Sequence, residues 1–300
     1  MRILICGEGF VGSEIYSLAS SERDHEVSFA IPDFKRPPQS LPDFQISVMK
    51  DQLASFQPDL LINTSGPINI SESFEARQLY VEDPVRQIRS HLRAISESGS
   101  NAKYLFLSSG AIYGSTSPVG ARENDLPNPL SPYAEGKLAA EAVIQTLIDS
   151  GEFGNSALIV RAFSLYSPNL RARVLDRIFS VATRGEPAEF FGTGAEIRDY
   201  VSMNALWMVI KRFLAPSQED QLETLNLSTG YGLSVSSLID IARESLEGRC
   251  RFPEVSFNGL QRMGDPDCMV GNSEKLSQFL GSWSENPVDG LAEYFEMRTQ

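Results

Sequence analysis

The sequence has few of the residues that build metal sites and disulfide frameworks. Among its 300 residues are three cysteines and two histidines, scattered along the chain. Neither His25 nor His91 lies near a cysteine or near the other histidine, which argues against a zinc site and against histidine-based catalysis. An odd number of scattered cysteines, Cys6, Cys250 and Cys268, is typical of a reducing compartment. We therefore expect a cytoplasmic protein that holds no metal.

Long apolar runs and an excess of positive charge are also missing. No stretch approaches the roughly eighteen uninterrupted apolar residues of a membrane helix. The run MRILICGEGF leads into a glycine turn without the longer apolar core of a signal peptide. The net charge of −13 would repel a polyanion. We therefore expect neither a membrane nor a nucleic acid as partner.

What the first half of the chain does have is an alternation of short apolar runs and longer amphipathic stretches. This alternation is typical of a parallel sheet covered by helices. The expected strands are Ile3–Cys6, Glu26–Ala30, Ile46–Met49, Asp59–Asn63, Tyr104–Ser108 and Ala157–Val160. The expected helices are Gly12–Ser20, Asp51–Phe56, Ser71–Ser98 with an interruption at Pro84, and Pro132–Ser150.

The second half is richer in loops and indicates a smaller second lobe. After about Arg161 most of the later glycines and prolines fall between a few regular segments. Those segments read as the helices Ala205–Leu214 and Ser234–Leu246 and the strand Thr224–Leu227. We expect residues 1–163 to form one domain, to which 224–246 return. Residues 164–223 and 247–300 would form a discontinuous lobe that binds the substrate.

A glycine turn follows the first expected strand. Gly7, Gly9 and Gly12 form a G-x-G-x-x-G pattern that leads directly into a helix. Glycines allow a tight turn and the close approach of a diphosphate, and the helix N-terminus offers N–H groups to the phosphates. The alternative is a plain strand-to-helix turn, but its place after the first strand favours a cofactor site. We expect a Rossmann-type, doubly wound α/β fold that binds a dinucleotide at Gly7, Gly9, Phe10, Val11 and Gly12.

The second expected strand bears on the choice between NAD and NADP. An acid at its end would hold the ribose hydroxyls of NAD, but Asp33 comes late and is followed by Lys35 and Arg36. These cations would suit the 2′-phosphate of NADP. The alternative is that both are solvated loop charges, which leaves NAD open. Ser65, just after the strand Asp59–Asn63, is expected to join the cofactor site.

A tyrosine and a lysine four residues apart begin the helix after Ser131. The spacing of Tyr133 and Lys137 is weak evidence alone, since the pair could sit on an exposed helix face. Upstream, however, Ser109 ends a buried strand at the sheet edge where such folds place ligands. Proton delivery to a carbonyl at neutral pH needs a tyrosine whose pKa is lowered by a nearby cation. Serine adds a hydrogen bond to the reacting oxygen.

Seven segments together resemble the extended short-chain dehydrogenase/reductase family, which contains nucleotide-sugar epimerases, dehydratases and ketoreductases. They appear in the order GEGFVG, LSSGAIYG, SPYAEGK, RAFSLYSP, GTGAEIRDYV, NLSTGYGLSV and RMGDPD with NSEKLSQFLG after it. The resemblance implies that Ser109, Tyr133 and Lys137 are catalytic and that Lys137 also holds the nicotinamide ribose. It further implies a homodimer through the helices 71–98 and 132–150.

The resemblance also assigns two arginines to a nucleoside-diphosphate sugar. Arg198 and Arg262 would grip its diphosphate, a role that suits guanidinium groups because they make charge-assisted hydrogen bonds to phosphate. The alternative for each arginine is a surface ion pair, for instance of Arg198 with Glu196 or Asp199.

Two reactions of the family are disfavoured by single positions. Its 4,6-dehydratases carry an Asp–Glu pair where this chain has Gly110 and Ala111, which cannot transfer protons. The GDP-fucose synthase type pairs a cysteine with a histidine. Here Ile112 precedes Tyr113, and His91 falls on an expected outer helix.

Two enzymatic functions remain, together with a third function that is not enzymatic. A 4-ketoreductase would reduce a 4-keto-6-deoxy-sugar nucleotide with NAD(P)H, while a 4-epimerase would use NAD to oxidise C4 and reduce it on the opposite face. The late acid, Lys35, Arg36 and the compact chain favour the reductase. A non-catalytic nucleotide-binding scaffold is the third reading, although such relatives typically lose the tyrosine or the lysine.

Overall fold

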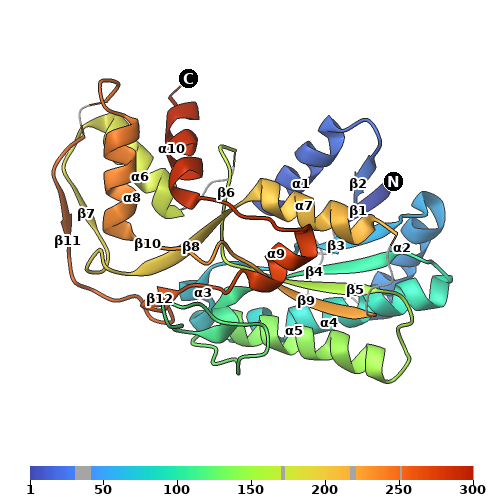
Figure 1. Ribbon diagram of the computed structural model, residues 1–300. Coiled ribbons are helices and arrows are strands. Elements are labelled where there is room, and N and C mark those ends of the chain that lie inside the picture. Colours follow the sequence, from blue (N-terminus) through green and yellow to red (C-terminus); the bar gives the residue numbers. More distant parts are fainter. Residues whose placement is uncertain (31–41, 170–172, 217–220, 251, 300) are drawn as a thin grey trace.

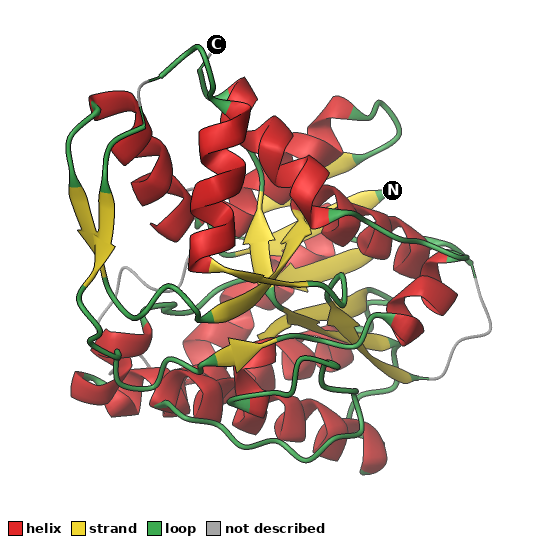
Figure 2. Ribbon diagram, turned by 60° about the vertical axis from the view of Figure 1, so that its left-hand side comes forward, coloured by secondary structure: helices red, strands yellow, loops and turns green. Residues whose placement is uncertain are grey.

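The chain folds into a large parallel sheet with helices on both faces and a smaller lobe beside it (Figures 1 and 2). The computed structural model describes residues 1–30, 42–169, 173–216, 221–250 and 252–299. The expected cofactor residues Lys35 and Arg36 lie outside the described residues. None of the described helices is long and apolar enough to cross a membrane.

The main sheet contains six parallel strands in the order β2-β1-β3-β4-β5-β9. Their bounds are Glu26–Phe29 for β2, Arg2–Cys6 for β1, Leu60–Asn63 for β3, Lys103–Ser109 for β4, Ala157–Ala162 for β5 and Leu222–Leu227 for β9. The inner strands are nearly continuous apolar runs because helices cover both of their faces. The Rossmann-type fold class predicted from the sequence is confirmed.

The strand order places a crevice at one edge of this sheet. The chain turns to one side from β1 to β2 and then crosses to the other side of β1 to form β3. At such a reversal the connections leave in opposite directions, and ligands of open α/β sheets bind at the carboxyl ends of the two strands. Here these are the ends of β1 and β3, at Cys6 and Asn63.

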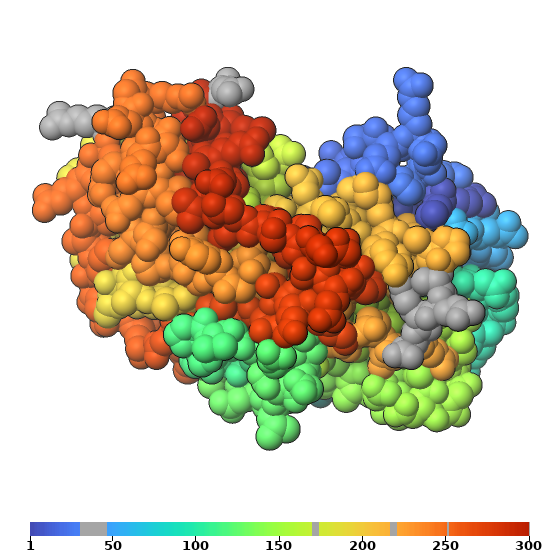
Figure 3. Space-filling view, viewed as in Figure 1, coloured from blue at the N-terminus to red at the C-terminus, as the bar shows by residue number. Residues whose placement is uncertain are grey.

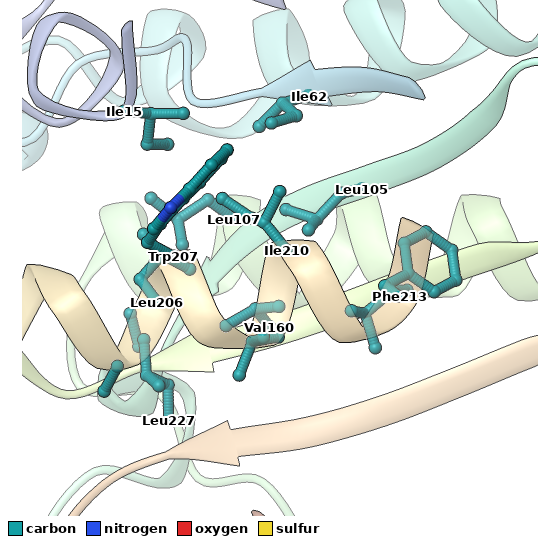
Figure 4. Close-up of a cluster of buried hydrophobic side chains, with 14 of the residues drawn as sticks. Ile15, Ile62, Leu105, Leu107, Val160, Leu206, Trp207, Ile210, Phe213 and Leu227 are labelled. Atoms are coloured by element: carbon teal, nitrogen blue, oxygen red, sulfur yellow. The ribbon is translucent and has the colours of Figure 1, made fainter. Parts of the chain in front are cut away.

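Two helical layers bury the sheet. On one face pack α1 (Phe10–Ser21), α7 (Met203–Leu214) and α9 (Glu274–Leu280), and on the other α2 (Pro42–Phe56), α4 (Arg77–Ser98) and α5 (Pro132–Asp149). Figure 4 shows the first layer, in which Trp207 and Ile210 of α7 lie over Leu107 of β4. Burial of these large apolar side chains stabilises the fold by about 2 kcal/mol each.

The smaller lobe has its own apolar core, centred on Tyr166, Leu238 and Phe295. Its strands are β6 (Ser164–Tyr166), β7 (Ala188–Phe190), β8 (Ile197–Ser202), β10 (Gly232–Ser234), β11 (Val255–Phe257) and β12 (Cys268–Met269). Its helices are α6 (Arg173–Arg184), α8 (Val235–Ser245) and α10 (Pro287–Met297). In Figure 1 this lobe lies beyond the carboxyl ends of the main strands.

The packing divides the chain differently from the sequence-based boundaries in three helices, α7, α8 and α9, the last of which packs on the main sheet although it was expected in the second lobe. The helix α7, expected in the second lobe, packs on the main sheet through Leu206, Trp207 and Ile210. The segment 224–246 returns to the sheet only as the strand β9, because the apolar side of α8 packs in the smaller lobe through Leu238 and Ile239. The sequence of an amphipathic helix does not indicate which apolar surface the helix will cover.

Two local predictions were wrong. The segment Ile46–Met49 lies inside the helix α2 and not in a strand. Met49 and Leu53, four residues apart, are both buried against α4, which is the spacing of a helix face. The helix expected over 71–98 is divided into α3 (Ile70–Glu75) and α4 at Ala76, while α4 continues through Pro84.

A polar cluster joins α1 to α7 and makes stability depend on pH. Glu22 accepts hydrogen bonds from Trp207 Nε1 and Lys211 Nζ, both at 2.8 Å. The bonds from Lys211 and Trp207 lower the pKa of Glu22 to about 2, from 4.5. Stability contributed by a carboxyl group with a lowered pKa is present above pH 4.5 and is lost as the pH falls toward 2.

We therefore expect Glu22→Gln to be less stable than the wild type at pH 6, with the difference disappearing near pH 2. Urea unfolding at several pH values measures it. Asp149→Gln, at the exposed end of α5, is the control. An equal difference for the Glu22 variant at all pH values would show that the charge of Glu22 is not involved.

Candidate active site at the carboxyl edge of the sheet

The glycine turn between β1 and α1 leaves no room for side chains at two of its positions. Gly7 has φ +114°, and a Cβ atom added there would lie 2.7 Å from Thr64 Oγ1 and 2.8 Å from Ser65 N. A Cβ atom on Gly12 would lie 1.9 Å from the carbonyl oxygen of Gly7. Both positions therefore require glycine. Through them the turn packs tightly against the end of β3, beside Ser65.

The N-terminus of α1 is open toward the same edge. Its N-cap residue, Gly9, provides no side-chain hydrogen bond, and the first turn contains no acidic residue. Among the described residues, nothing lies within 4 Å of where a Cβ atom on Gly9 would be, so this position of the turn is not packed against protein. Unsatisfied N–H groups and the positive end of the helix dipole favour an anion here. With Phe10 and Val11 in its first turn, this end of α1 fits the diphosphate of a dinucleotide.

Ser65 is held in place by a buried polar network behind it. The Oδ1 atom of Asn63 accepts hydrogen bonds from the backbone N–H of Ser65, at 3.0 Å, and from its hydroxyl. The amide nitrogen of Asn63 lies 3.0 Å from the hydroxyl of Tyr104, which lies 3.3 Å from Nδ1 of His91. His91 is thus on the inner side of α4 and not on an outer face. Burial lowers its pKa to about 4, so it is neutral at pH 7.

Ser109 and Tyr133 meet at the edge next to the glycine turn. Ser109 is the last residue of β4, and its hydroxyl accepts a hydrogen bond from Ala111 N at 3.2 Å. Tyr133 is in the first turn of α5, which begins after the N-cap Ser131. Burial raises the pKa of Tyr133 above its usual value, and its hydrogen bond with the Ser109 side chain opposes the shift. The phenol therefore carries its proton at neutral pH.

Lys137 lies one helical turn after Tyr133 and is buried. Its Nζ atom donates a hydrogen bond to the carbonyl oxygen of Leu107 at 2.8 Å and lies 4.8 Å from the centre of the Phe106 ring. Burial lowers the pKa of Lys137 to about 8, and the Glu141 carboxylate opposes that shift. The ammonium is therefore mostly charged at pH 7, close to two residues of β4 that precede Ser109.

The two expected substrate arginines lie in the smaller lobe. Arg198, in β8, forms an ion pair with Asp265 at 2.5 Å and not with Glu196 or Asp199. Arg262 lies over the ring of Phe191, 4.4 Å from its centre. The structure does not pair the two arginines with each other, but it connects them through one segment, since Asp265 follows Arg262 by three residues.

This segment reaches from the smaller lobe to the start of the helix that carries Tyr133. A Cβ atom on Gly264 would lie 2.8 Å from the Phe74 ring of α3 and 3.1 Å from the carbonyl oxygen of Leu130. The segment of the two arginines therefore contacts α3 and the residue before the N-cap of α5 as well as the smaller lobe. Figure 3 shows a hollow in the surface between the blue N-terminal segment and the red and orange C-terminal lobe.

Sequence reasoning missed two charged residues next to this site, Glu141 and Arg161. They form a buried ion pair at 2.8 Å directly behind Lys137. Two signals could have found them. Glu141 follows Lys137 by four residues in the same helix, and Arg161 is a charged residue inside an apolar strand that parallel packing must bury.

The described residues contain no group of histidine, cysteine, aspartate and glutamate side chains that could hold a metal ion. The side chains at this edge offer a hydroxyl, a phenol and an ammonium group, at the same end of the sheet as a turn suited to a dinucleotide. Such a set can donate or accept one proton at a hydroxyl or carbonyl oxygen.

Comparison with known proteins identifies relatives of the whole chain. The model of the NAD-dependent epimerase/dehydratase family matches residues 3–228. A UDP-glucose 4-epimerase from Corynebacterium glutamicum is 25% identical over 316 aligned residues, covering 96% of this chain and 92% of its own.

Two solved structures show the same fold. A UDP-glucose 4-epimerase from Thermotoga maritima with UDP-glucose superposes with a TM-score of 0.81 at 22% identity and covers all of both chains. The structure of RMD from Pseudomonas aeruginosa complexed with NADPH has a TM-score of 0.79 at 20% identity, covering 99% of each chain.

Proposed function

The chain belongs to the NAD-dependent epimerase/dehydratase family, and we propose that it interconverts the C4 epimers of a nucleoside-diphosphate sugar with a resident NAD. The observation that carries this proposal is the hydrogen bond between Ser109 and Tyr133, with Lys137 one turn along α5, at the same carboxyl edge of the sheet as the glycine turn. The named epimerases that match over nearly the whole chain support the epimerase over the ketoreductase that the sequence alone favoured.

In this proposal Tyr133 is the acid and base. In its deprotonated form Tyr133 would take the proton of the C4 hydroxyl as this group is oxidised, and the resulting phenol would return the proton to the C4 oxygen as the carbonyl is reduced on the other face. Ser109 donates a hydrogen bond to the same oxygen. Lys137, one turn along α5, favours the phenolate because a nearby positive charge lowers the pKa of tyrosine.

The turn at Gly7, Gly9 and Gly12 supports a bound dinucleotide, whose diphosphate would lie against the N-terminus of α1. Ser65 and Lys137 would complete its site. NAD supplies a two-electron acceptor that becomes the donor in the second half of the cycle. The absence of a side chain at Gly9 and of acids in the first turn of α1 favours the negative charge of its phosphates.

The position after Ser109 disfavours a 4,6-dehydratase. A Cβ atom added to Gly110 would lie 2.8 Å from the ring of Phe163, so an acid at this position does not fit without moving the core. Ala111, which follows, is buried and cannot transfer a proton. A second proton-transferring pair is therefore missing where the dehydration would need it.

The substrate in this proposal is a nucleoside-diphosphate sugar held from the smaller lobe. Arg198 and Arg262 would bind its diphosphate. In the structure Arg198 pairs with the carboxylate of Asp265, which the diphosphate would replace. UDP-sugars are the first substrates to test, because the named relatives act on them. The expected homodimer through α4 and α5 and the cytoplasmic location stay predictions.

A 4-ketoreductase that consumes NADPH is the second candidate. It is supported by the sequence after β2, where the first acid, Asp33, comes late and the cations Lys35 and Arg36 would suit a 2′-phosphate; all three lie outside the described residues. The same Tyr133, Ser109 and Lys137 serve both reactions, so the cofactor distinguishes them.

The decisive experiment identifies the cofactor. The purified protein is denatured and any released dinucleotide is identified and counted, and UDP-glucose and UDP-galactose are then incubated with the native protein without added cofactor. We expect one NAD⁺ for each chain and interconversion of the two sugars. The emptied protein is then titrated with NADH and NADPH.

An empty site that prefers NADPH, with NADPH consumed in the presence of a 4-keto-sugar nucleotide, would replace the epimerase by the ketoreductase. Failure to bind any dinucleotide would contradict both enzymatic candidates. The non-catalytic scaffold would then be the remaining reading.

A further inference from the structure

A buried ion pair lies directly behind the proposed catalytic helix. Arg161 of β5 contacts both carboxylate oxygens of Glu141 in α5, with Nη2 at 2.8 Å from Oε2 and Nε at 3.2 Å from each oxygen. Both side chains are almost fully enclosed, Glu141 with 6% and Arg161 with 10% of the side chain exposed. At this depth each charge depends on the other, because an unpaired buried charge is strongly unfavourable.

The remaining hydrogen-bonding groups of the pair are also occupied. Nη1 of Arg161 donates to the hydroxyl of Tyr113 and to the carbonyl oxygen of Glu123, both at 2.7 Å. The hydroxyl of Ser108, next to Ser109, donates to Oε1 of Glu141. The pair thereby connects α5 to the end of β4 and to the turn that follows it. Its geometry leaves the guanidinium no freedom to turn away.

Lys137 is the cation that Glu141 would otherwise attract. The two residues are four apart in α5, the spacing at which a lysine and a glutamate form a pair on a helix. In the described part of the chain, however, Lys137 has no carboxylate within ion-pair distance. Its Nζ atom donates to Leu107 instead. Both oxygens of Glu141 are already engaged by Arg161 and Ser108.

We propose that Arg161 is a positioning residue for Lys137. By holding both oxygens of Glu141, it prevents this carboxylate from pairing with Lys137, so the ammonium stays at the carbonyl oxygen of Leu107, two residues before Ser109 in β4. The inference rests on the proposed roles of Tyr133 and Lys137 for its effect on turnover. Its effect on the lysine itself does not depend on any substrate or cofactor.

The geometry separates this role from simple stabilisation of the fold. Without Arg161, an uncompensated Glu141 favours the charged form of Lys137 and draws the ammonium toward itself. Without Glu141, an uncompensated Arg161 disfavours the charged lysine. The two single replacements therefore move the pKa of Lys137 in opposite directions, whereas loss of packing alone has no reason to do so. The phenols that face this cluster are Tyr113, which contacts Arg161, and Tyr133 and Tyr80 beside α5, and all three are unchanged in the variants.

The test compares Arg161→Met, Glu141→Gln and the double variant in the full chain. The pKa of Lys137 is measured in cofactor-free protein by NMR of lysine labelled with ¹³C at Cε, and its signal is assigned by its loss in Lys137→Met. We expect the pKa to rise by about one unit in Arg161→Met and to fall by about one unit in Glu141→Gln. In the double variant it returns close to the wild-type value.

Turnover is the second readout. We expect Arg161→Met to lower kcat at least about tenfold with little change of KM, because the ammonium is misplaced and the arginines of the smaller lobe are not. The double variant recovers most of this loss, since removal of both charges leaves no buried ion without a partner. Arg298→Met is the matched control, because Arg298 pairs with Asp176 far from Lys137 in the smaller lobe. It leaves the pKa of Lys137 unchanged.

Shifts of the lysine pKa in the same direction in both single variants, or no shift in either, would overturn the proposal. If Arg161→Met does not fold, Glu141→Gln and the double variant carry the comparison. Opposite pKa shifts in a protein that turns over no sugar nucleotide would support the positioning role while contradicting the proposed function. Wild-type turnover in both single variants, with the pKa of Lys137 unchanged, would support the proposed function and contradict the positioning role.

Discussion

Replacement of Tyr133 with phenylalanine is expected to lower kcat by about 10³-fold and to leave the binding of NAD unchanged. The variant loses only the hydroxyl that exchanges the proton, while the ring keeps its place in the first turn of α5. Without it, the proton of the C4 hydroxyl has no base within reach except the neutral Ser109. The measurement is the rate of interconversion of UDP-glucose and UDP-galactose, beside the amount of NAD⁺ released on denaturation.

A second tyrosine provides the control for this variant. Tyr16 is half-exposed on α1, with its ring stacked on Phe29 at 5.0 Å, and Tyr16→Phe is expected to keep the wild-type rate. A near-normal rate in Tyr133→Phe would contradict the assigned role. A variant that has lost NAD together with activity would show that Tyr133 builds the cofactor site and would leave its part in proton transfer unsupported.

The sequence predicts where in the fold a candidate site residue lies when that place is encoded within a few neighbouring residues. The turn at Gly7, Gly9 and Gly12 is recognisable because a strand, a glycine pattern and a helix follow one another directly. Ser109 and Tyr133 lie 24 positions apart, but each marks the end of an element, and parallel sheets bring such ends to one edge. Local pattern and topology together are sufficient for them.

The features that the sequence did not predict depend on contacts between distant segments of the chain. Nothing near Arg161 in the sequence says that Glu141 will face it, because their contact is set by the packing of α5 on β5. The choice of surface by α7 and α8 has the same origin. A short apolar run such as that around Met49 suits a strand or a helix until its partner is known. The choice between the epimerase and the ketoreductase is open to the sequence for a different reason, since both proposed reactions use the same three side chains.

Gly136, which directly precedes Lys137 in α5, explains why α5 lies so close to α4. A Cβ atom on Gly136 would lie 1.9 Å from the carbonyl oxygen of Tyr80 and 2.9 Å from its carbonyl carbon. Four residues after Tyr80 comes Pro84, which has no N–H to donate to that carbonyl inside the helix. The carbonyl lies instead against the glycine of α5. The close approach of the two helices therefore depends on the missing side chain.

Gly136→Ala is accordingly expected to lower the free energy of unfolding by about 3 kcal/mol, because the new methyl group meets backbone that cannot rotate away. The helices must separate, and the shift moves Tyr133 away from Ser109 and Lys137 away from Leu107. A displacement of about 1 Å in a site of this kind costs about 10²-fold in kcat. Urea unfolding and the epimerase rate measure the two effects. Gly154→Ala is the matched control, because a Cβ atom there meets nothing within 4 Å. If both alanine variants are equally stable and active, α4 does not constrain the catalytic helix in this way.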